Sequence, residues 1–168
     1  MPPEAARLRA IVDTGNEVDA IMVSVGVNHV LSGHAPAQFA FELEAMVREL
    51  RKIVGRRTAI LLNGLPPMSR FPNIPFPLSV FAGAYVRTLS GTACEVCERT
   101  GLATFVDCEF FEALLPQASM KERLPYFAPD KFHPSVRAMD EFWTPMNARL
   151  ALEVLEGRGL PSKEVCDS

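Results

Sequence analysis

The alternation of short apolar runs with longer amphipathic segments is the feature of this sequence that most constrains its fold. Three runs are almost wholly apolar: residues 18–25, 58–62 and 103–107. Each has the length of a strand, and a continuous apolar run is typical of a strand buried on both faces of a parallel sheet. Because the runs alternate with helical segments, right-handed crossovers are implied. The sequence therefore predicts an α/β fold, a parallel three-strand sheet flanked by helices.

Four segments around these runs have the spacing of amphipathic helices: residues 4–12, 36–54, 78–99 and 135–156. The clearest is the second, where Pro36 suits the first turn and Gly55 suits the residue that ends the helix. In the last helix, Ser135 suits the N-cap and Pro145 is expected to introduce a kink.

Two long loops interrupt the pattern. Residues 65–77 are rich in proline, which removes backbone donors, so this loop is predicted to be neither helix nor central strand. Residues 109–132 form the second loop, in which 109–115 has the spacing of a helical turn. We expect a single domain over residues 1–156 and a loose C-terminal tail over 157–168.

Charge and composition exclude several classes of function. The net charge is −3 and no basic stripe is present, which argues against nucleic acid as a partner. No apolar run reaches the roughly 18 residues of a membrane span, and no signal peptide is recognised, so the default expectation is a cytoplasmic protein. Cys94 and Cys97 form a C-x-x-C without a second pair, so no metal site is predicted and buried thiols are expected.

Candidate catalytic residues follow the third run. Asp130 and His133 lie three residues apart, just before the last predicted helix. A carboxylate in this position can accept the Nδ1 proton of the imidazole, which leaves Nε2 free to take a proton from a nucleophile. The spacing alone is also compatible with an unremarkable loop aspartate and a surface histidine.

A second polar group follows the first run, at the edge where ligands bind in open α/β sheets. Gly26 permits a tight turn, and the side-chain amide of Asn28 can donate to a developing oxyanion. Asparagine after a strand is also a common turn former. Residues Asn63–Pro67 follow the second run, so they are expected at the same edge of the sheet.

These residues resemble motifs of one known family, the SGNH/GDSL hydrolases. VSVGVNHV (23–30) resembles the third conserved block, usually G-x-N-D, and APDKFHPS (128–135) resembles the fifth, D-x-x-H-P. LNGLPPMSRFPNIPFPL (62–78) looks like the proline-rich loop of esterase and lysophospholipase-like members. The similarity extends over roughly residues 5–155, nearly the whole chain.

The resemblance implies a flavodoxin-like sheet and a serine ester hydrolase that needs no cofactor. His133 would be the general base, Asp130 its orienting carboxylate, Asn28 the oxyanion donor and Gly26 the turn residue of its block. The substrate would be a small-molecule ester or a lysolipid. Four apolar residues of the proline-rich loop are candidates for the acyl pocket, or equally for packing of the loop: Met68, Phe71, Ile74 and Phe76.

The sequence departs from the family in three places. The first block, which carries the serine nucleophile, and the second, which supplies a glycine backbone donor to the oxyanion, are absent. The fold is therefore expected to be an N-terminally truncated version in which strand 18–25 forms an edge. Ser24 is expected inside that strand and is therefore a poor substitute. His29 stands where the family usually has Asp, and we expect His29 and His34 to be loop histidines.

Three interpretations remain open. The chain is an ester hydrolase whose nucleophile lies outside the printed sequence, or a catalytically inactive binding module that keeps the cleft. The third is an assembly subunit, completed by self-association or by another chain at the edge of strand 18–25.

Overall fold

A computed structural model describes residues 3–15, 17–107 and 119–157. Three strands, β1 (Ala20–Ser24), β2 (Ala59–Asn63) and β3 (Thr104–Val106), form a sheet in the order β1-β2-β3. Both ladders are parallel. The predicted fold class, an α/β fold with a three-strand parallel sheet, is confirmed.

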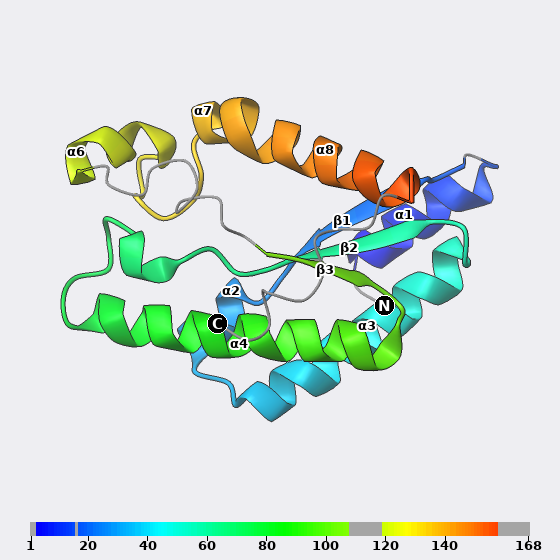
Figure 1. The fold of residues 1–168 in the computed structure, drawn as a ribbon, viewed down its shortest axis with the longest axis horizontal. Coiled ribbons are helices and arrows are strands. Elements are labelled where there is room, and N and C mark those ends of the chain that lie inside the picture. The colour runs from blue at the N-terminus through cyan, green and yellow to red at the C-terminus, as the bar shows by residue number, and fades with distance from the viewer. Residues whose placement is uncertain (1–2, 16, 108–118, 158–168) are drawn as a thin grey trace.

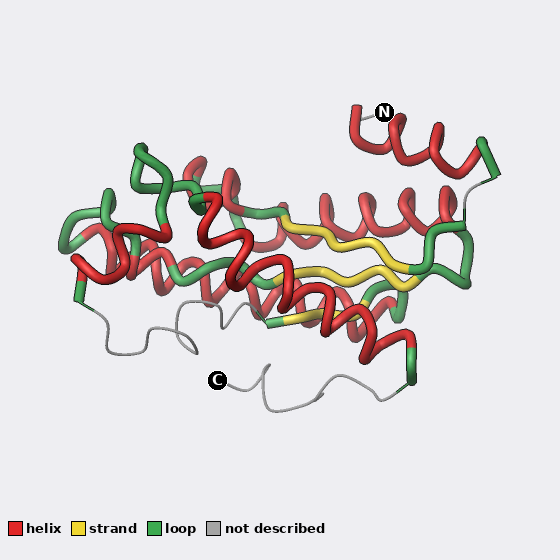
Figure 2. The backbone as a smooth tube through the Cα atoms, turned by 90° about the horizontal axis from the view of Figure 1, so that it is seen from above, coloured by secondary structure: helices red, strands yellow, loops and turns green. Residues whose placement is uncertain are grey.

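Helices cover both faces of the sheet (Figure 1). On one face lie α3 (Pro36–Val54) and α4 (Leu78–Thr100), which also pack against each other. On the other lies the C-terminal helical segment, which comprises α7 (Val136–Ala138), a π-helical turn (Met139–Trp143) and α8 (Thr144–Leu155). The N-terminal helix α1 (Pro3–Asp13) packs against α3. Viewed from above, the strands lie side by side between these layers (Figure 2).

The core explains why the strand sequences are apolar throughout. Ile60 and Leu62 of β2 belong to the cluster between the sheet and α3 and α4, whereas Leu61 packs against Leu150 of α8 on the opposite face. β2 is therefore buried on both sides. In β1 most side chains are half-buried, because this strand lies at an edge and pairs with β2 alone among the described strands.

Short helical turns occupy the segments predicted as turns and loops. The helix α2 (Val27–Ser32) follows β1 directly, and a 3₁₀ turn (Met68–Arg70) lies within the proline-rich loop. Within the second loop are α6 (Met120–Arg123) and another 3₁₀ turn (Leu124–Tyr126). The possible turn at 109–115 and the tail from residue 158 lie outside the described residues.

The last helix begins as predicted and is irregular near its proline. Ser135 is the N-cap, and its hydroxyl accepts a hydrogen bond from Ala138 N at 3.2 Å. The π-helical turn ends two residues before Pro145. A proline lacks the backbone donor and its ring crowds the carbonyl four residues earlier, so a wider turn at this position relieves both conflicts.

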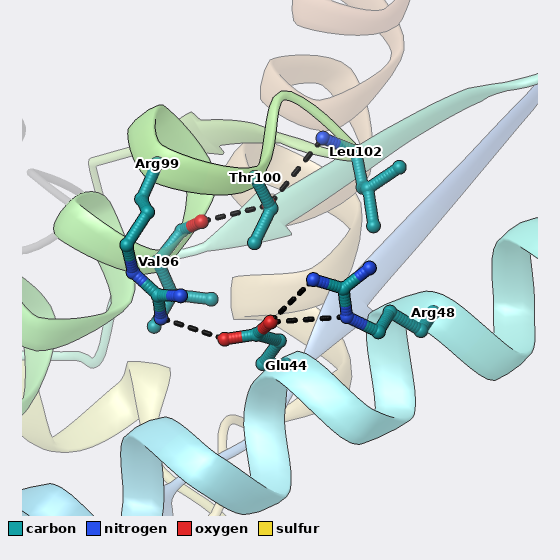
Figure 3. A network of polar contacts seen from close by, with 6 residues as sticks. All are labelled: Glu44, Arg48, Val96, Arg99, Thr100 and Leu102. Carbon is teal, nitrogen blue, oxygen red and sulfur yellow. Dashed lines mark hydrogen bonds and ion pairs between the residues drawn. The ribbon is translucent and has the colours of Figure 1, made fainter.

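A polar network links α3 to α4 at the surface (Figure 3). Glu44 accepts from Arg48 on its own helix at 3.0 and 2.5 Å and pairs with Arg99 of α4 at 2.7 Å. The hydrogen bond from Arg48, which is the larger cause, and that from Arg99 hold the pKa of Glu44 below its usual value. In the same region the Thr100 hydroxyl donates to Val96 O at 2.8 Å and accepts from Leu102 N at 3.4 Å, which closes the end of α4.

Arg51 joins three chain segments at the amino end of the sheet. Its guanidinium donates to Gly55 O and Thr58 O, both at 2.7 Å, and to Leu102 O at 2.5 Å. The first two bonds close the end of α3 and the turn into β2, and the third reaches the turn into β3. Partial burial lowers the pKa of Arg51, although the group remains the cation that these carbonyls bind.

Replacing Arg51 with methionine should therefore lower the free energy of unfolding by about 2 kcal/mol, because three carbonyls lose a charged donor. Urea denaturation followed by circular dichroism measures the change. Lys52→Met is the matched control, since Lys52 makes an exposed ion pair with Glu49 and should cost less than about 0.5 kcal/mol. Equal losses for the two variants would contradict the role given to Arg51.

Candidate active site

The loop that carries Asp130 and His133 is folded as a small hairpin. Phe127 and Pro134 form an antiparallel bridge, and Ala128 N donates to His133 O at 2.8 Å. The turn is closed by Lys131 N, which donates to Ala128 O at 2.8 Å, and Lys131 has a left-handed backbone (φ 58°). The three-residue spacing in the sequence thus becomes a tight turn that faces the two side chains toward each other.

Asp130 organises this turn through both carboxylate oxygens. Oδ1 accepts from the backbone nitrogens of Phe132 and His133 at 2.9 and 3.0 Å, and Oδ2 accepts from His133 Nδ1 at 2.6 Å. The imidazole hydrogen bond and then the two backbone donors lower the pKa of Asp130 from 3.8 to about 2. Because an ionised carboxylate accepts and cannot donate, His133 carries a proton on Nδ1, and in the neutral imidazole Nε2 is then the acceptor.

Aromatic packing attaches this hairpin to the proline-rich loop. Phe71, 5% exposed, has its ring 5.3 Å from Phe127 and 5.4 Å from Phe132, both in edge-to-face geometry. The Phe132 ring in turn lies 5.3 Å from the imidazole of His133. The hairpin base is therefore fixed in the core, whereas the side chains of His133 and Asp130 are 71% and 50% exposed.

The Gly26 turn directs the chain from β1 into α2. Gly26 has φ 111° and ψ −19°, and its carbonyl accepts from His29 N at 2.9 Å and Val30 N at 3.1 Å. A Cβ on Gly26 would lie 3.0 Å from Leu65 and 3.2 Å from the Phe39 ring. Both the positive φ and the close packing therefore require glycine.

Asn28 lies at the second position of α2, and its side chain is exposed. Within the described part of the chain its amide has no hydrogen-bond partner, either in the Asp130–His133 pair or elsewhere. Of the four residues proposed for the catalytic and oxyanion sites, the structure thus brings together Asp130 and His133. Gly26 and Asn28 lie after the carboxyl end of β1.

The four residues suggested for an acyl pocket have different environments. Met68 and Phe71 are buried in the core, at 0% and 5% exposure, and Ile74 packs against that core. Phe76 is 82% exposed. Their role in substrate binding stays a prediction.

Two expectations for single residues need correction. Ser24 is the exposed last residue of β1 and accepts from Asn63 Nδ2 at 2.9 Å, because the strand ends earlier than its apolar run suggests. His29 lies in α2 rather than in a loop, and its Nε2 donates to Glu42 Oε2 at 2.8 Å. Sequence periodicity could not reveal a six-residue helix beginning at a glycine.

The described nucleophilic side chains are not placed for catalysis. Among the described residues no serine hydroxyl is hydrogen-bonded to His133. Ser90 accepts from Leu65 N at 3.1 Å, and Ser135 donates to Pro125 O at 2.8 Å. Cys97 is buried, and burial raises its pKa to about 11, which keeps it a thiol. Cys94 is disulfide-bonded, so the expectation of a thiol there is wrong.

Asn63 and Glu42 are the polar residues near these turns whose contacts the sequence did not reveal. Asn63 is 3% exposed and links the carboxyl ends of β2 and β1 through Ser24. Glu42 lies one helical turn after Phe39 on α3 and faces α2. The position of Asn63 at the end of a predicted strand indicated that it lies near the site. Glu42 gave no such indication, because in the sequence it resembles any polar residue of an amphipathic helix.

Within the described ranges, no group of three or more histidine, cysteine or acidic residues is arranged to hold a metal ion. In the same ranges every helix is too short or too polar to cross a membrane.

The parallel sheet carries the Gly-x-Asn turn after β1 and the Asp–His hairpin before the last helix, the two motifs that resemble SGNH/GDSL hydrolases. Residues 2–140 match the model of the GDSL-like lipase/acylhydrolase family, and the chain belongs to this family. The resemblance inferred from the two motifs is thereby confirmed.

The structure is similar to that of an acetyl xylan esterase from Geobacillus stearothermophilus. The TM-score is 0.50 at 19% sequence identity, and the match covers 95% of this chain and 70% of that one. At this identity the likeness concerns the fold. None of the curated proteins matches the sequence significantly.

The geometry of Asp130 predicts its titration. In NMR spectra of the carboxyl carbon, Asp130 should titrate near pH 2, because His133 and two backbone amides stabilise the ionised form. The pair is then intact above pH 3.8, the usual pKa, and is lost as the pH falls through about 2. In His133→Ala the midpoint should rise toward 3.8 without reaching it, since the backbone donors remain. An unchanged midpoint in that variant would show that the imidazole does not hold the carboxylate.

Proposed function

We propose that this protein is an ester hydrolase of the SGNH/GDSL type in which Asp130 and His133 form the acid–base pair and Asn28 is the oxyanion donor. The observation that carries the proposal is the 2.6 Å hydrogen bond from His133 Nδ1 to Asp130, which leaves Nε2 open to accept a proton. Family membership supports acyl-ester chemistry for such a pair.

The proton movements follow from this arrangement. A serine hydroxyl attacks the ester carbonyl carbon while Nε2 of His133 takes the hydroxyl proton, and Asp130 stabilises the imidazolium. The tetrahedral intermediate then expels the alcohol, which receives that proton. Water hydrolyses the resulting acyl-serine by the same steps in reverse, so no cofactor enters the reaction.

The exposed amide of Asn28 suits the negative charge that develops on the carbonyl oxygen. It extends from the first turn of α2 and is free of intramolecular hydrogen bonds in the described structure. Gly26 fixes the start of that turn, so the donor is placed before the substrate binds. A preorganised donor costs no reorganisation during the reaction.

The nucleophile has to reach His133 from a segment other than the described serines. The free edge of β1 is the natural position for that segment, because a strand added there places its carboxyl end beside Gly26 and Asn28. The segment belongs to this protein or to a partner chain. If the segment comes from a partner chain, we propose that this partner is a second copy of the protein that associates through β1.

We propose a small-molecule ester as the substrate class, with lysolipids favoured by the apolar surface near the proline-rich loop. Phe76, Leu78, Val80 and Phe81 are all between 56% and 82% exposed around the start of α4. An acyl chain can cover such side chains at a gain of about 25 cal/mol per Å². Acetylated sugars would gain little there.

A binding module without turnover is the alternative, and the exposed Asp–His pair would then serve ligand recognition. Chemical labelling separates the two functions because fluorophosphonates react with activated serines and not with unactivated ones.

The test is to label the protein in extract of its native source with a tagged fluorophosphonate, isolate it and map the labelled peptide by mass spectrometry. Labelling of one serine, reduced at least 10³-fold in rate by His133→Ala, is expected because the base is removed. His34→Ala is the control, since His34 is an exposed histidine that forms no hydrogen bond or ion pair with a carboxylate among the described residues. Absence of label on the intact protein would refute the hydrolase and leave the binding module.

Asn28 gives an independent prediction. Replacing Asn28 with alanine should lower kcat for p-nitrophenyl acetate about 10²–10³-fold with little change in KM, because the lost bond forms mainly in the transition state. Asn28→Asp should be at least as impaired, since a carboxylate repels the oxyanion. An unchanged kcat in either variant would remove Asn28 from the oxyanion hole.

A further inference from the structure

Asn28 can stabilise an oxyanion only if α2 is held in one orientation, and α2 is six residues long. Its backbone ends are closed by Gly26 and by Gly33, whose N–H donates to Val30 O at 3.3 Å, while His34 N donates to His29 O at 3.2 Å. No side chain caps its N-terminus. Such a short helix has little stability of its own, so tertiary contacts must set its rotation.

His29 provides the polar contact between α2 and α3. Its Nε2 donates to Glu42 Oε2 at 2.8 Å, and its ring lies 5.0 Å from Phe39 in edge-to-face geometry. The side chain is 20% exposed, and His34 approaches the ring at 5.2 Å from the loop that follows. Phe39 also packs against Gly26, so one face of α3 supports both the start of α2 and His29.

The imidazole of His29 makes its side-chain hydrogen bond through Nε2. Nδ1 is buried and has no hydrogen-bond partner among the described residues, so Nε2–Glu42 is the polar bond that orients the imidazole. Glu42 is itself held by Gln38, which donates to its other oxygen. Because both of its oxygens accept hydrogen bonds, the Glu42 carboxylate is held in one orientation as the acceptor for His29.

The helix geometry couples this bond to the neighbouring residue. Consecutive residues of a helix project about 100° apart, so with His29 directed at α3 the side chain of Asn28 projects away from it toward solvent. Asn28 is accordingly exposed. Rotation of α2 about its axis would move both side chains together.

We infer that His29, through its hydrogen bond to Glu42, is a positioning residue that fixes α2 and thereby aims the Asn28 amide at the substrate. The inference rests on the proposed role of Asn28. It assigns His29 no contact with substrate and no proton transfer, and it predicts that the effect of His29 on turnover passes through Asn28.

A double-mutant cycle tests this in the native full-length protein with p-nitrophenyl acetate. His29→Leu keeps an apolar side chain against Phe39 and removes the bond to Glu42, so kcat should fall about tenfold at unchanged KM. His29→Gln restores a donor and should recover most of the rate. In the Asn28→Ala background, His29→Leu should cause no further loss, because the aimed donor is gone.

Arg48→Met is the matched control, since it removes a side-chain hydrogen bond of α3, to Glu44, that involves neither Glu42 nor α2, and it should leave kcat unchanged. A loss of equal size in both backgrounds, or no loss in the wild-type background, would overturn the inference. Loss of labelling in His133→Ala reports on the hydrolase independently of these variants.

NMR of the Asn28 side-chain amide tests the same inference without turnover. His29→Leu should increase the mobility of that amide and speed hydrogen exchange in α2, whereas Arg48→Met and His29→Gln should not. If Asn28 is equally ordered in all variants, His29 does not position it. This readout decides the role of His29 even if the protein proves to be a binding module.

Discussion

β2 pairs with β1 on one side and with β3 on the other, and these parallel ladders fix where each segment of the candidate site begins. Because parallel strands end at one edge, the turn at Gly26, the buried amide of Asn63 and the chain leaving β3 start from the same side of the sheet. Asn63 reinforces this edge by bonding to Ser24 across the strand ends. The sheet therefore supplies the frame, and the polar side chains lie on the turns that leave it.

Two buried aromatic residues connect that frame to the site. Phe71 supports the Asp130–His133 hairpin, and Phe39 supports the Gly26 turn and the ring of His29. Neither ring has a polar role. Each holds a loop whose own hydrogen bonds would not fix it against the core, so the exposed polar groups can be well placed while remaining accessible. From the sequence, Phe71 was a candidate either for an acyl pocket or for packing of the loop, and its 5% exposure shows that it packs in the core.

The strands, the long helices and the Asp130–His133 contact could be predicted because each leaves a local signal. Apolar runs mark β1 and β2, three- and four-residue spacing marks α3, and a D-x-x-H spacing allows a carboxylate to reach the imidazole within one turn. Contacts between distant residues leave no such signal. The bond from His29 to Glu42 joins residues 13 apart, and the bond from Asn63 to Ser24 joins residues 39 apart. Both depend on which helix face meets which strand, which periodicity alone does not specify.

Solvent exposure connects the free edge of β1 with the chemistry proposed for the site. Electrostatic stabilisation of an oxyanion is strong where water is excluded, yet the side chains of His133 and Asp130 are 71% and 50% exposed and Asn28 is exposed. A segment paired to β1 would cover the edge and bring a hydroxyl to the same side of the sheet. It would also reduce the solvent exposure of Asn28, which lies just beyond the end of β1. One added strand would thus explain the open edge of β1, the source of the nucleophile and the exposure of the polar side chains together. For this reason the edge of β1 and the nucleophile belong to the same proposal.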